Sequence, residues 1–360
     1  MLRRSKRLAL RHPTISNLPD DVIRQCLLRV PYKSHSKLKA VCRKWRDVVG
    51  KPEFYKDRMT TGTREHLICM IQCLRRRIRS TRYRRQRRFY FIRRICRIIV
   101  LDPVRYTWTV LRHMPDFPTG VPLFCECVCF NGKLVLMGGL HPQNWHEMSK
   151  RVYIFDFVSA KWLRGADMPT RRIGFACSVS SSTRLIYVAG GKDDQNALLT
   201  AEAYNVEEDK WETLSPMSQQ LGDCHGVFLG GKFIVFGEVG NNAEIFDPNT
   251  GLWRRVDDMW RFGSSFTSSL VASGNLYTFT ERQLMKYDVE KNNWLLETVL
   301  PTNFRGAVCT TEWRGHIFVS SPHRRRQVCY LLNPSTGELI QFYVPRNFVG
   351  LTLSAATVEI

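Results

Sequence analysis

Five tryptophans stand in register along this 360-residue sequence. The spacings from Trp108 to Trp294 are 54, 49, 42 and 41 residues, and Leu339 follows 45 residues later in the same register. Each position follows an apolar stretch and a short turn rich in Asp, Asn, Pro or Gly, which predicts a β-hairpin. A repeat of this length is typical of propellers and solenoids. The segments are IIVLDPVRYTW (98–108), VYIFDFVSAKW (152–162), AEAYNVEEDKW (201–211), AEIFDPNTGLW (243–253), LMKYDVEKNNW (284–294) and CYLLNPSTGEL (329–339).

A second pair of strands is predicted before each hairpin from the second one onward. The clearest examples are FCECVCFNGKLVLMGG (124–139) and FACSVSSSTRLIYVAGG (175–191), which both end in two glycines. Glycine at this place permits close approach of the backbone and a positive φ angle. The combination of diglycine, four strands and tryptophan resembles the kelch repeat, and the resemblance implies an all-β propeller.

The number of blades follows from how the ring closes. The first unit, beginning at Glu65, has a second strand (HLICMIQC, 66–73) and the hairpin of Trp108, but it lacks a first strand. The C-terminal segment 350–360 resembles the first strand of the other units. If this segment pairs with 66–73, the ring has no free edge and contains six blades.

The residues before the repeats predict a small helical module over 15–58. Asp20 and Asp21 begin one helix, where the helix dipole favours anions, and Pro31 ends it. Ser36 is expected to cap a second helix that runs to Gly50. A module of this size has too small a core to be stable alone.

The same segment resembles an F-box. The resemblance rests on LPDD (18–21), LLRVP (27–31), VCRKWR (41–46) and PEF (52–54). It implies binding to a Skp-type adaptor and, through it, to a cullin ligase core. Alternatively, the apolar residues of the module pack within the chain as a helical cap on the next domain. The candidate adaptor-binding residues are Leu18, Pro19, Asp20, Val22, Ile23, Leu27, Val30, Pro31, Leu38, Val41, Cys42 and Trp45.

The formal net charge of +22 is concentrated in two short segments. Residues 1–13 hold five basic residues and no acid, and residues 75–97 hold twelve arginines and no acid. The rest of the chain carries only about +5. This distribution indicates a mildly basic body with charged additions and argues against a separate nucleic-acid-binding domain.

The arginine block is predicted to be an insertion, 75–94, in the loop between the second and third strands of the first blade. Ring closure would place it beside the equivalent loop of the sixth blade, and the loops that link blades would reach the same rim. Arginine pairs bidentately with carboxylates, so an acidic or acidic-patched protein target is the favoured partner and a nucleic acid the less favoured one. A solvated loop or a nuclear-localisation run is the alternative, and the blade-linking arginines could instead have a local structural role. The candidate target-binding residues are Arg75, Arg76, Arg77, Arg84, Arg85, Arg171, Arg172, Arg261, Arg305, Arg324, Arg325, Arg326 and Arg346.

Other classes of protein find little support in the sequence. No apolar run is long enough to span a membrane, and no secretory signal is recognisable at the start. The twelve cysteines include no C-x-x-C pair, and the histidines fall at unrelated positions of the repeat, so we expect no metal site, no cofactor and no catalytic residue. The free cysteines indicate the nucleus, the cytoplasm or both.

Together these features predict a small all-α F-box module followed by an all-β six-bladed kelch propeller. The predicted segments are a basic tail (1–14), the F-box (15–58), a linker (59–64) and the propeller (65–360). The resemblance to plant-type F-box/kelch-repeat proteins implies a non-catalytic substrate receptor of an SCF-type ubiquitin ligase that directs a target to proteasomal degradation. The alternative is a ligase-independent scaffold or a nucleic-acid adaptor that uses the arginine-rich face.

Overall fold

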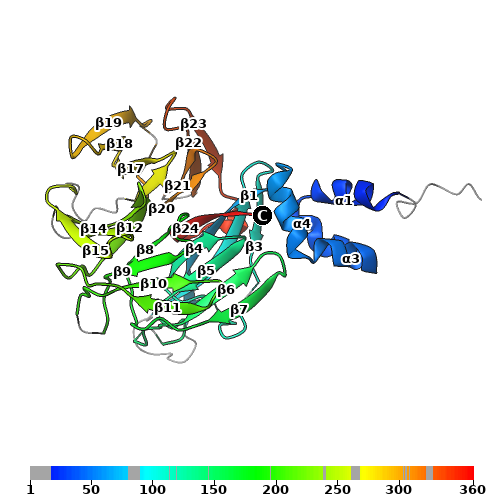
Figure 1. Ribbon diagram of the computed structural model, residues 1–360, viewed down its shortest axis with the longest axis horizontal. Coiled ribbons are helices and arrows are strands. Elements are labelled where there is room, and N and C mark those ends of the chain that lie inside the picture. Colours follow the sequence, from blue (N-terminus) through cyan, green and yellow to red (C-terminus); the bar gives the residue numbers. More distant parts are fainter. Residues whose placement is uncertain are drawn as a thin grey trace, which may run out of the picture. The chain divides into compact units, whose positions relative to one another are not determined.

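The structure is a computed structural model with two compact units, one comprising Met1–Glu65 with Ile360 and the other His66–Glu359 (Figure 1). It describes residues 18–79, 90–112, 114–118, 120–144, 146–194, 196–237, 241–260, 268–302, 304, 306–307, 309–321 and 327–360, with the backbone alone over 75–79 and 90–94.

The first unit contains four α-helices and a short 3-10 helix among its described residues. These are α1 (Asp20–Leu28), η2 (Tyr32–Ser34), α2 (His35–Val41), α3 (Arg43–Val49) and α4 (Pro52–Thr60). The single helix predicted after Ser36 is wrong, because the chain is extended at Cys42 (φ −157°, ψ 167°) and divides into α2 and α3. The thiol of Cys42 compensates by accepting a hydrogen bond from the Trp45 amide at 3.4 Å, as an N-cap does.

Pro52 begins a further helix that was not predicted from the sequence. It occupies the first turn of α4, where a missing N–H has no cost because that group has no partner within the helix. As a result α4 continues to Thr60, into the segment expected to be a linker.

The core of the first unit joins α1 to α4 around a buried arginine. Ile23, Leu27 and Phe54 are almost fully buried, and so is the side chain of Arg58. The Arg58 guanidinium donates to the carbonyl oxygens of Leu28 (2.9 Å) and Val30 (2.8 Å), which lie at and beyond the end of α1. It also forms an ion pair with Glu65 at 2.9 Å. Arg58 therefore satisfies carbonyls that the end of a helix leaves without partners.

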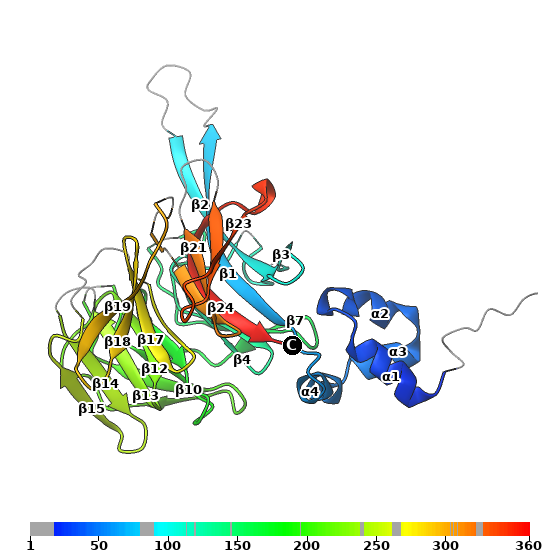
Figure 2. The same ribbon diagram turned by 90° about the horizontal axis from the view of Figure 1, so that it is seen from above.

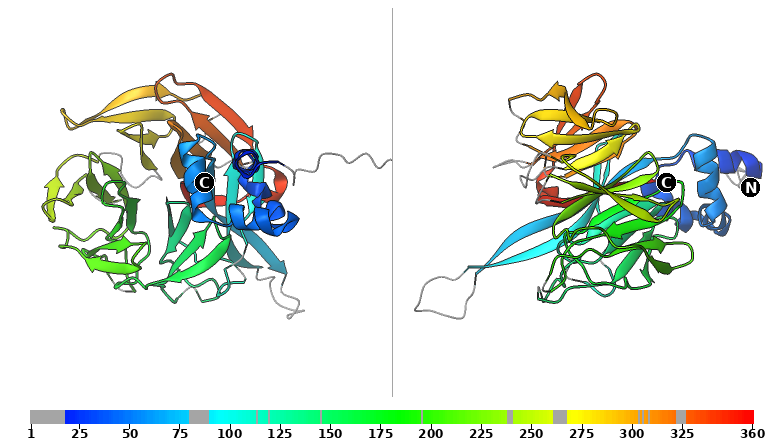
Figure 3. Two further views of the ribbon diagram at one scale, coloured as in Figure 1. Left: turned by 45° about the vertical axis from the view of Figure 1, so that its right-hand side comes forward. Right: turned by 60° about the vertical axis from the view of Figure 1, so that its left-hand side comes forward.

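The described residues of the second unit form six four-stranded antiparallel sheets arranged around an axis (Figure 3). The innermost strands follow one another around the ring in the order β24, β4, β8, β12, β16 and β20. This confirms the predicted six-bladed propeller. The strands are β1 (His66–Arg79), β2 (Tyr90–Asp102), β3 (Thr107–Val110), β4 (Glu126–Phe130), β5 (Lys133–Met137), β6 (Val152–Asp156), β7 (Lys161–Gly165), β8 (Ala176–Val179), β9 (Ile186–Ala189), β10 (Ala201–Asn205), β11 (Lys210–Thr213), β12 (Cys224–Leu229), β13 (Lys232–Gly237), β14 (Ala243–Asp247), β15 (Leu252–Val256), β16 (Ser269–Ala272), β17 (Asn275–Thr280), β18 (Gln283–Asp288), β19 (Asn293–Val299), β20 (Cys309–Trp313), β21 (His316–Ser321), β22 (Val328–Leu332), β23 (Leu339–Tyr343) and β24 (Leu351–Glu359).

The ring closes where the C-terminal strand joins the first sheet. β24 pairs antiparallel with β1, from His66 opposite Glu359 to Cys73 opposite Leu351. The Trp313 indole strengthens this junction by donating to the carbonyl oxygen of His66 at 2.8 Å. The pairing of the C-terminal segment with 66–73 is the one expected from the sequence.

Four of the repeated tryptophans bind their sheet to the one before it. The indole N–H of Trp162, in β7, donates at 3.0 Å to the carbonyl oxygen of Arg112, which follows the last strand of the preceding sheet. The same bond recurs from Trp211 to Ala166 (2.9 Å), from Trp253 to Ser215 (2.6 Å) and from Trp294 to Met259 (2.7 Å). This donor explains why the sequence repeats tryptophan at this place.

The diglycines fill a position that has no room for a side chain. Gly138 and Gly139 have φ angles of 65° and 87°. A Cβ at Gly138 would lie 2.6 Å from the carbonyl oxygen of Arg172, in the segment that leads to the next sheet. Glycine here therefore allows consecutive sheets to approach each other closely.

The arginine block is only partly a loop, which corrects the insertion predicted over 75–94. β1 and β2 continue into it as a ladder in which Arg75 lies opposite Arg94 and Arg79 lies opposite Tyr90. Figure 2 shows this pair of strands projecting beyond the other strands of the propeller. The segment contains no proline or glycine to end the ladder, and Ile, Phe and Tyr between the arginines favour strands. Residues 80–89 lie outside the described residues.

Candidate functional site

The first candidate site is an apolar surface on the helical unit. Leu18, Val22 and Val41 are 42%, 39% and 60% exposed, which is high for large apolar side chains. Val22 lies in the first turn of α1, and Leu18 immediately precedes Pro19, the N-cap residue of that helix. We call Leu18, Val22 and Val41 the exposed apolar set. Pro19, Asp20 and Cys42 are also exposed, while Val30, Pro31, Leu38 and Trp45 are half-buried.

Two predicted adaptor-binding residues are not available at this surface. Ile23 and Leu27 are each 2% exposed and belong to the core. They lie on the buried face of α1 together with Leu28, whereas Val22 lies on the exposed face of the helix. Ile23 and Leu27 therefore belong to the core of the helical unit.

Ion pairs hold α1 against its neighbouring helices beside the exposed apolar set. Asp20 pairs with Lys44 of α3, and Arg24 pairs with Asp57 of α4 at 2.5 Å. Both pairs are substantially exposed to water, so each contributes little to stability. Their effect is to orient α1 and thereby the side chains of Leu18 and Val22.

A buried histidine supports the turn between α1 and α2. Burial, together with the nearby Arg58 and Lys39, lowers the pKa of His35 to about 4, although a hydrogen bond with the Val30 carbonyl raises it. The ring lies 3.1 Å from the Tyr55 hydroxyl and 2.9 Å from that carbonyl oxygen. His35 is therefore neutral at physiological pH and has a structural role.

Only a few of the arginines predicted to form the cationic face have side chains that the structure describes. Arg171 is exposed and forms an ion pair with Asp194 at 3.4 Å, and Arg346 is exposed in a 3-10 helix, η3 (Arg346–Phe348). Arg75, Arg76 and Arg77 are placed by their backbone in β1. The remaining candidates, Arg84, Arg85, Arg261, Arg305, Arg324, Arg325 and Arg326, lie outside the described residues.

Arg172 is not a surface residue and is removed from the candidate target-binding set. Its side chain is fully buried and forms an ion pair with Glu202 at 2.7 Å. It also donates to the carbonyl oxygen of Gly190 at 2.7 Å. These contacts correspond to the local structural role that the sequence analysis left open for arginines in the blade-linking loops.

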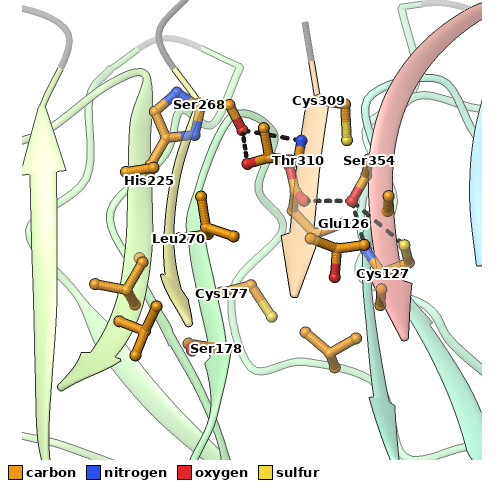
Figure 4. A pocket seen from close by; sticks show the side chains of 18 of the residues that line it. Glu126, Cys127, Cys177, Ser178, His225, Ser268, Leu270, Cys309, Thr310 and Ser354 are labelled. Atoms are coloured by element: carbon orange, nitrogen blue, oxygen red, sulfur yellow. Dashed lines mark hydrogen bonds between the residues drawn. The ribbon is translucent and has the colours of Figure 1, made fainter. Parts of the chain in front are cut away.

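The second candidate site is a cavity of about 1620 Å³ on the axis of the propeller, and the sequence analysis missed it (Figure 4). Side chains of the innermost strands line it, including many serines and threonines. The described lining residues contain no lysine or arginine, in contrast to the net charge of the chain. The charged or titratable residues among them, apart from the cysteines, are Glu126, Asp223, His225, Glu281 and Glu312.

Glu126 lies at the beginning of β4, where its carboxylate meets β24. The Ser354 hydroxyl donates to Glu126 Oε2 at 3.0 Å and accepts a hydrogen bond from the Cys127 amide at 3.3 Å. Burial raises the pKa of Glu126 to about 7, although the bond from Ser354 lowers it. Burial also raises the pKa values of the thiols of Cys127, Cys177 and Cys309, so these neighbours are uncharged.

Other polar groups of the cavity come from neighbouring sheets. The Ser268 and Thr310 hydroxyls form a hydrogen bond of 2.7 Å across β16 and β20. The surrounding protein lowers the pKa of His225, against the charge of Asp223, although the side chain remains exposed to the cavity. Within the described part of the chain, no group of three or more His, Cys, Asp or Glu side chains is placed to hold a metal ion.

The two units define a class of protein in which a small helical module is joined to a β-propeller. Residues 15–57 match the F-box domain, and residues 123–169 and 175–218 match the Kelch motif. "F-box/kelch-repeat protein At2g44130" from Arabidopsis thaliana is 34% identical over 306 residues, which cover 76% of this chain and 73% of the relative. "F-box/kelch-repeat protein SKIP20", also from Arabidopsis thaliana, is 32% identical, and the matched residues cover 70% of this chain and 68% of the relative. The chain belongs to the F-box/kelch-repeat family.

A solved structure supports the architecture of the second unit. The superposition with "Structure of YjhT" covers 68% of this chain and 91% of the YjhT chain, with a TM-score of 0.53 and 12% sequence identity. At this identity the likeness concerns the fold alone. None of the described helices is long and apolar enough to cross a membrane.

Members of the F-box/kelch-repeat family are typically substrate receptors of SCF-type ubiquitin ligases and are generally not enzymes, and the F-box domain implies binding to a Skp-type adaptor.

Proposed function

We propose that this chain is the substrate receptor of an SCF-type ubiquitin ligase. The helical unit binds a Skp-type adaptor, and through it the cullin core, with its exposed apolar set. The propeller holds a protein target for ubiquitination and proteasomal degradation. The observation that carries the proposal is the exposure of Leu18, Val22 and Val41 in a unit that matches the F-box domain.

The role requires no catalytic group in this chain. A receptor accelerates transfer by raising the effective concentration of its target near a conjugating enzyme that the ligase carries. An acidic target fits the net charge of +22, and a nuclear or cytoplasmic location fits the free cysteines.

Adaptor binding is tested by placing charge in the exposed apolar set. We expect Leu18→Asp with Val22→Asp to weaken binding of a purified Skp-type adaptor by at least about tenfold, because buried anions without partners oppose association. Surface plasmon resonance measures the affinity, and circular dichroism checks that the helices remain folded. The matched control is Leu163→Asp in β7, where Leu163 is similarly exposed at 47%.

The control variant should bind the adaptor as the unchanged chain does. If the double variant is folded and retains full affinity, the exposed apolar set is not the adaptor site. If the unchanged chain binds no adaptor, the ligase role is refuted and a ligase-independent scaffold becomes the better description.

A further inference from the structure

The cavity on the propeller axis combines negative charge with many hydroxyl groups. All six innermost strands contribute lining residues, and none of the described ones is lysine or arginine. A cavity with acidic walls in a low-dielectric surrounding concentrates positive charge from solution. The volume, about 1620 Å³, exceeds that of typical sites for small molecules and leaves room for water beside a ligand.

Of the four described carboxylates of the cavity, three already form an ion pair or a hydrogen bond or are exposed to water. Asp223 forms an ion pair with Lys192, and Glu312 accepts a hydrogen bond from the Gly315 amide at 2.6 Å. Glu281 is exposed in the turn between β17 and β18. These three therefore already have partners or water.

Glu126 is different, because the described groups around it are uncharged. Ser354 of β24 donates the hydrogen bond already described, and the same hydroxyl lies 3.3 Å from the thiol of Cys127, the next residue of β4. The uncharged thiols of Cys177 in β8 and Cys309 in β20 are close enough to feel the charge of Glu126. Among the described residues, Glu126 forms no ion pair within 4.0 Å. A partly buried carboxylate without a counter-charge is costly while it is ionised, and either a proton or a cationic ligand removes that cost.

The surrounding groups match the hydrogen-bonding needs of an organic cation. An ammonium group has three N–H donors and a guanidinium group has five, and neither has an acceptor. Glu126 provides two carboxylate oxygens, and Ser354, Ser268 and Thr310 provide hydroxyl oxygens on the same side of the cavity (Figure 4). Val179 and Val271, which line the cavity and are only half-buried, provide apolar surface for an attached alkyl chain.

We propose that this cavity binds an organic cation, an alkylammonium or guanidinium group, with Glu126 as its counter-charge. The group can belong to a free small amine or to a lysine or arginine side chain of a peptide. This inference does not depend on the proposed ligase role.

The test compares charged and neutral probes of the same shape. Isothermal titration calorimetry of the full chain measures binding of n-pentylamine and of 1-pentanol. A second pair consists of capped peptides that contain one lysine or one norleucine between glycines. We expect the cationic member of a pair to bind at least about tenfold more tightly, which is the effect of one charge-assisted hydrogen bond in a shielded site.

Two variants separate Glu126 from the general negative charge of the cavity. Glu126→Gln preserves the shape and the acceptor for Ser354, and it should weaken cation binding by at least about tenfold. Glu281→Gln removes the same charge from the exposed turn and should weaken binding by less than about threefold. Thermal unfolding of both variants shows whether the propeller remains intact.

A proton measurement provides a second readout. Close to neutral pH, Glu126 is partly protonated, because its pKa is about 7. A bound cation favours the ionised carboxylate, so binding should release about half a proton per site near pH 7. Titrations in two buffers of different ionisation enthalpy measure this release, and it should vanish in Glu126→Gln.

The two pairs of probes also identify the source of the cation. Binding of the free amine supports a small-molecule ligand, and binding of the lysine peptide alone supports a side chain of a protein partner. Either result supports the proposal if it depends on Glu126. Equal binding of cationic and neutral probes, no binding of either cation, or unchanged binding by a folded Glu126→Gln variant would overturn it.

Discussion

At the scale of single residues, Glu126 connects the cavity to the stability of the fold. Its pKa of about 7 lies above its ordinary value of 4.5, so the folded chain binds this proton more tightly than the unfolded chain. The stabilising contribution of protonation is fully present below about pH 4.5 and is lost as the pH rises through 7.

Glu126→Gln should therefore flatten the pH dependence of stability. We expect the unchanged chain to lose about 1 to 3 kcal/mol of unfolding free energy from this group between about pH 5 and about pH 8, an amount that cavity water reduces by screening. At the higher pH the variant should be more stable than the unchanged chain. Denaturant titrations at both pH values measure the difference, and equal slopes with pH for the two proteins would contradict the assignment.

Glu126 could not be recognised as a site residue from the sequence. It stands within FCECVCF (124–130), where the alternating cysteines indicate a buried strand and a single glutamate carries no motif. Its partner Ser354 is 228 positions away, and only ring closure brings them together. By contrast, Leu18 and Val22 were found because they belong to a short local pattern.

At the scale of elements, regular structure was predictable where a pattern repeats. The outer hairpins follow from the turn residues and from tryptophan, whose indole donor binds the preceding sheet at 2.6–3.0 Å. The break between α2 and α3 was not predictable, because residues 36–49 contain neither proline nor glycine and their apolar spacing suits one helix. The extension of β1 into the arginine block was missed because dense charge resembles a loop.

The segment that links β7 to β8 depends on the buried pair of Arg172 and Glu202. We expect Arg172→Ala to destabilise the propeller by about 3 to 5 kcal/mol, because it leaves Glu202 buried without a counter-charge and removes the donor to Gly190. The neighbouring Arg171→Ala should change stability by less than about 0.5 kcal/mol, since Arg171 is exposed. Denaturant unfolding compares the two variants, and similar losses would show that the burial of Arg172 is unimportant.

At the scale of the whole molecule, stability depends on the pairing of β24 with β1. A chain that ends before Leu351 would expose the edge of β1 and remove the innermost strand of one sheet. We expect this truncation to abolish cooperative thermal unfolding of the propeller and not merely to loosen one sheet. Differential scanning calorimetry measures it, with Glu359→Ala, an exposed position in the same strand, as the control. A truncated chain that keeps a single sharp transition would contradict this view of the ring.

The closure through β24 also determines when, during synthesis, the propeller can be completed. β24 is translated after all the other described strands, yet it pairs with the first of them. While the ribosome is still making the later sheets, the edge of β1 remains unpaired. A nascent chain is therefore vulnerable to mispairing for almost the whole of its synthesis. The ring is therefore completed only after translation of its last strand, and a ribosome that stalls before that point releases an incomplete propeller.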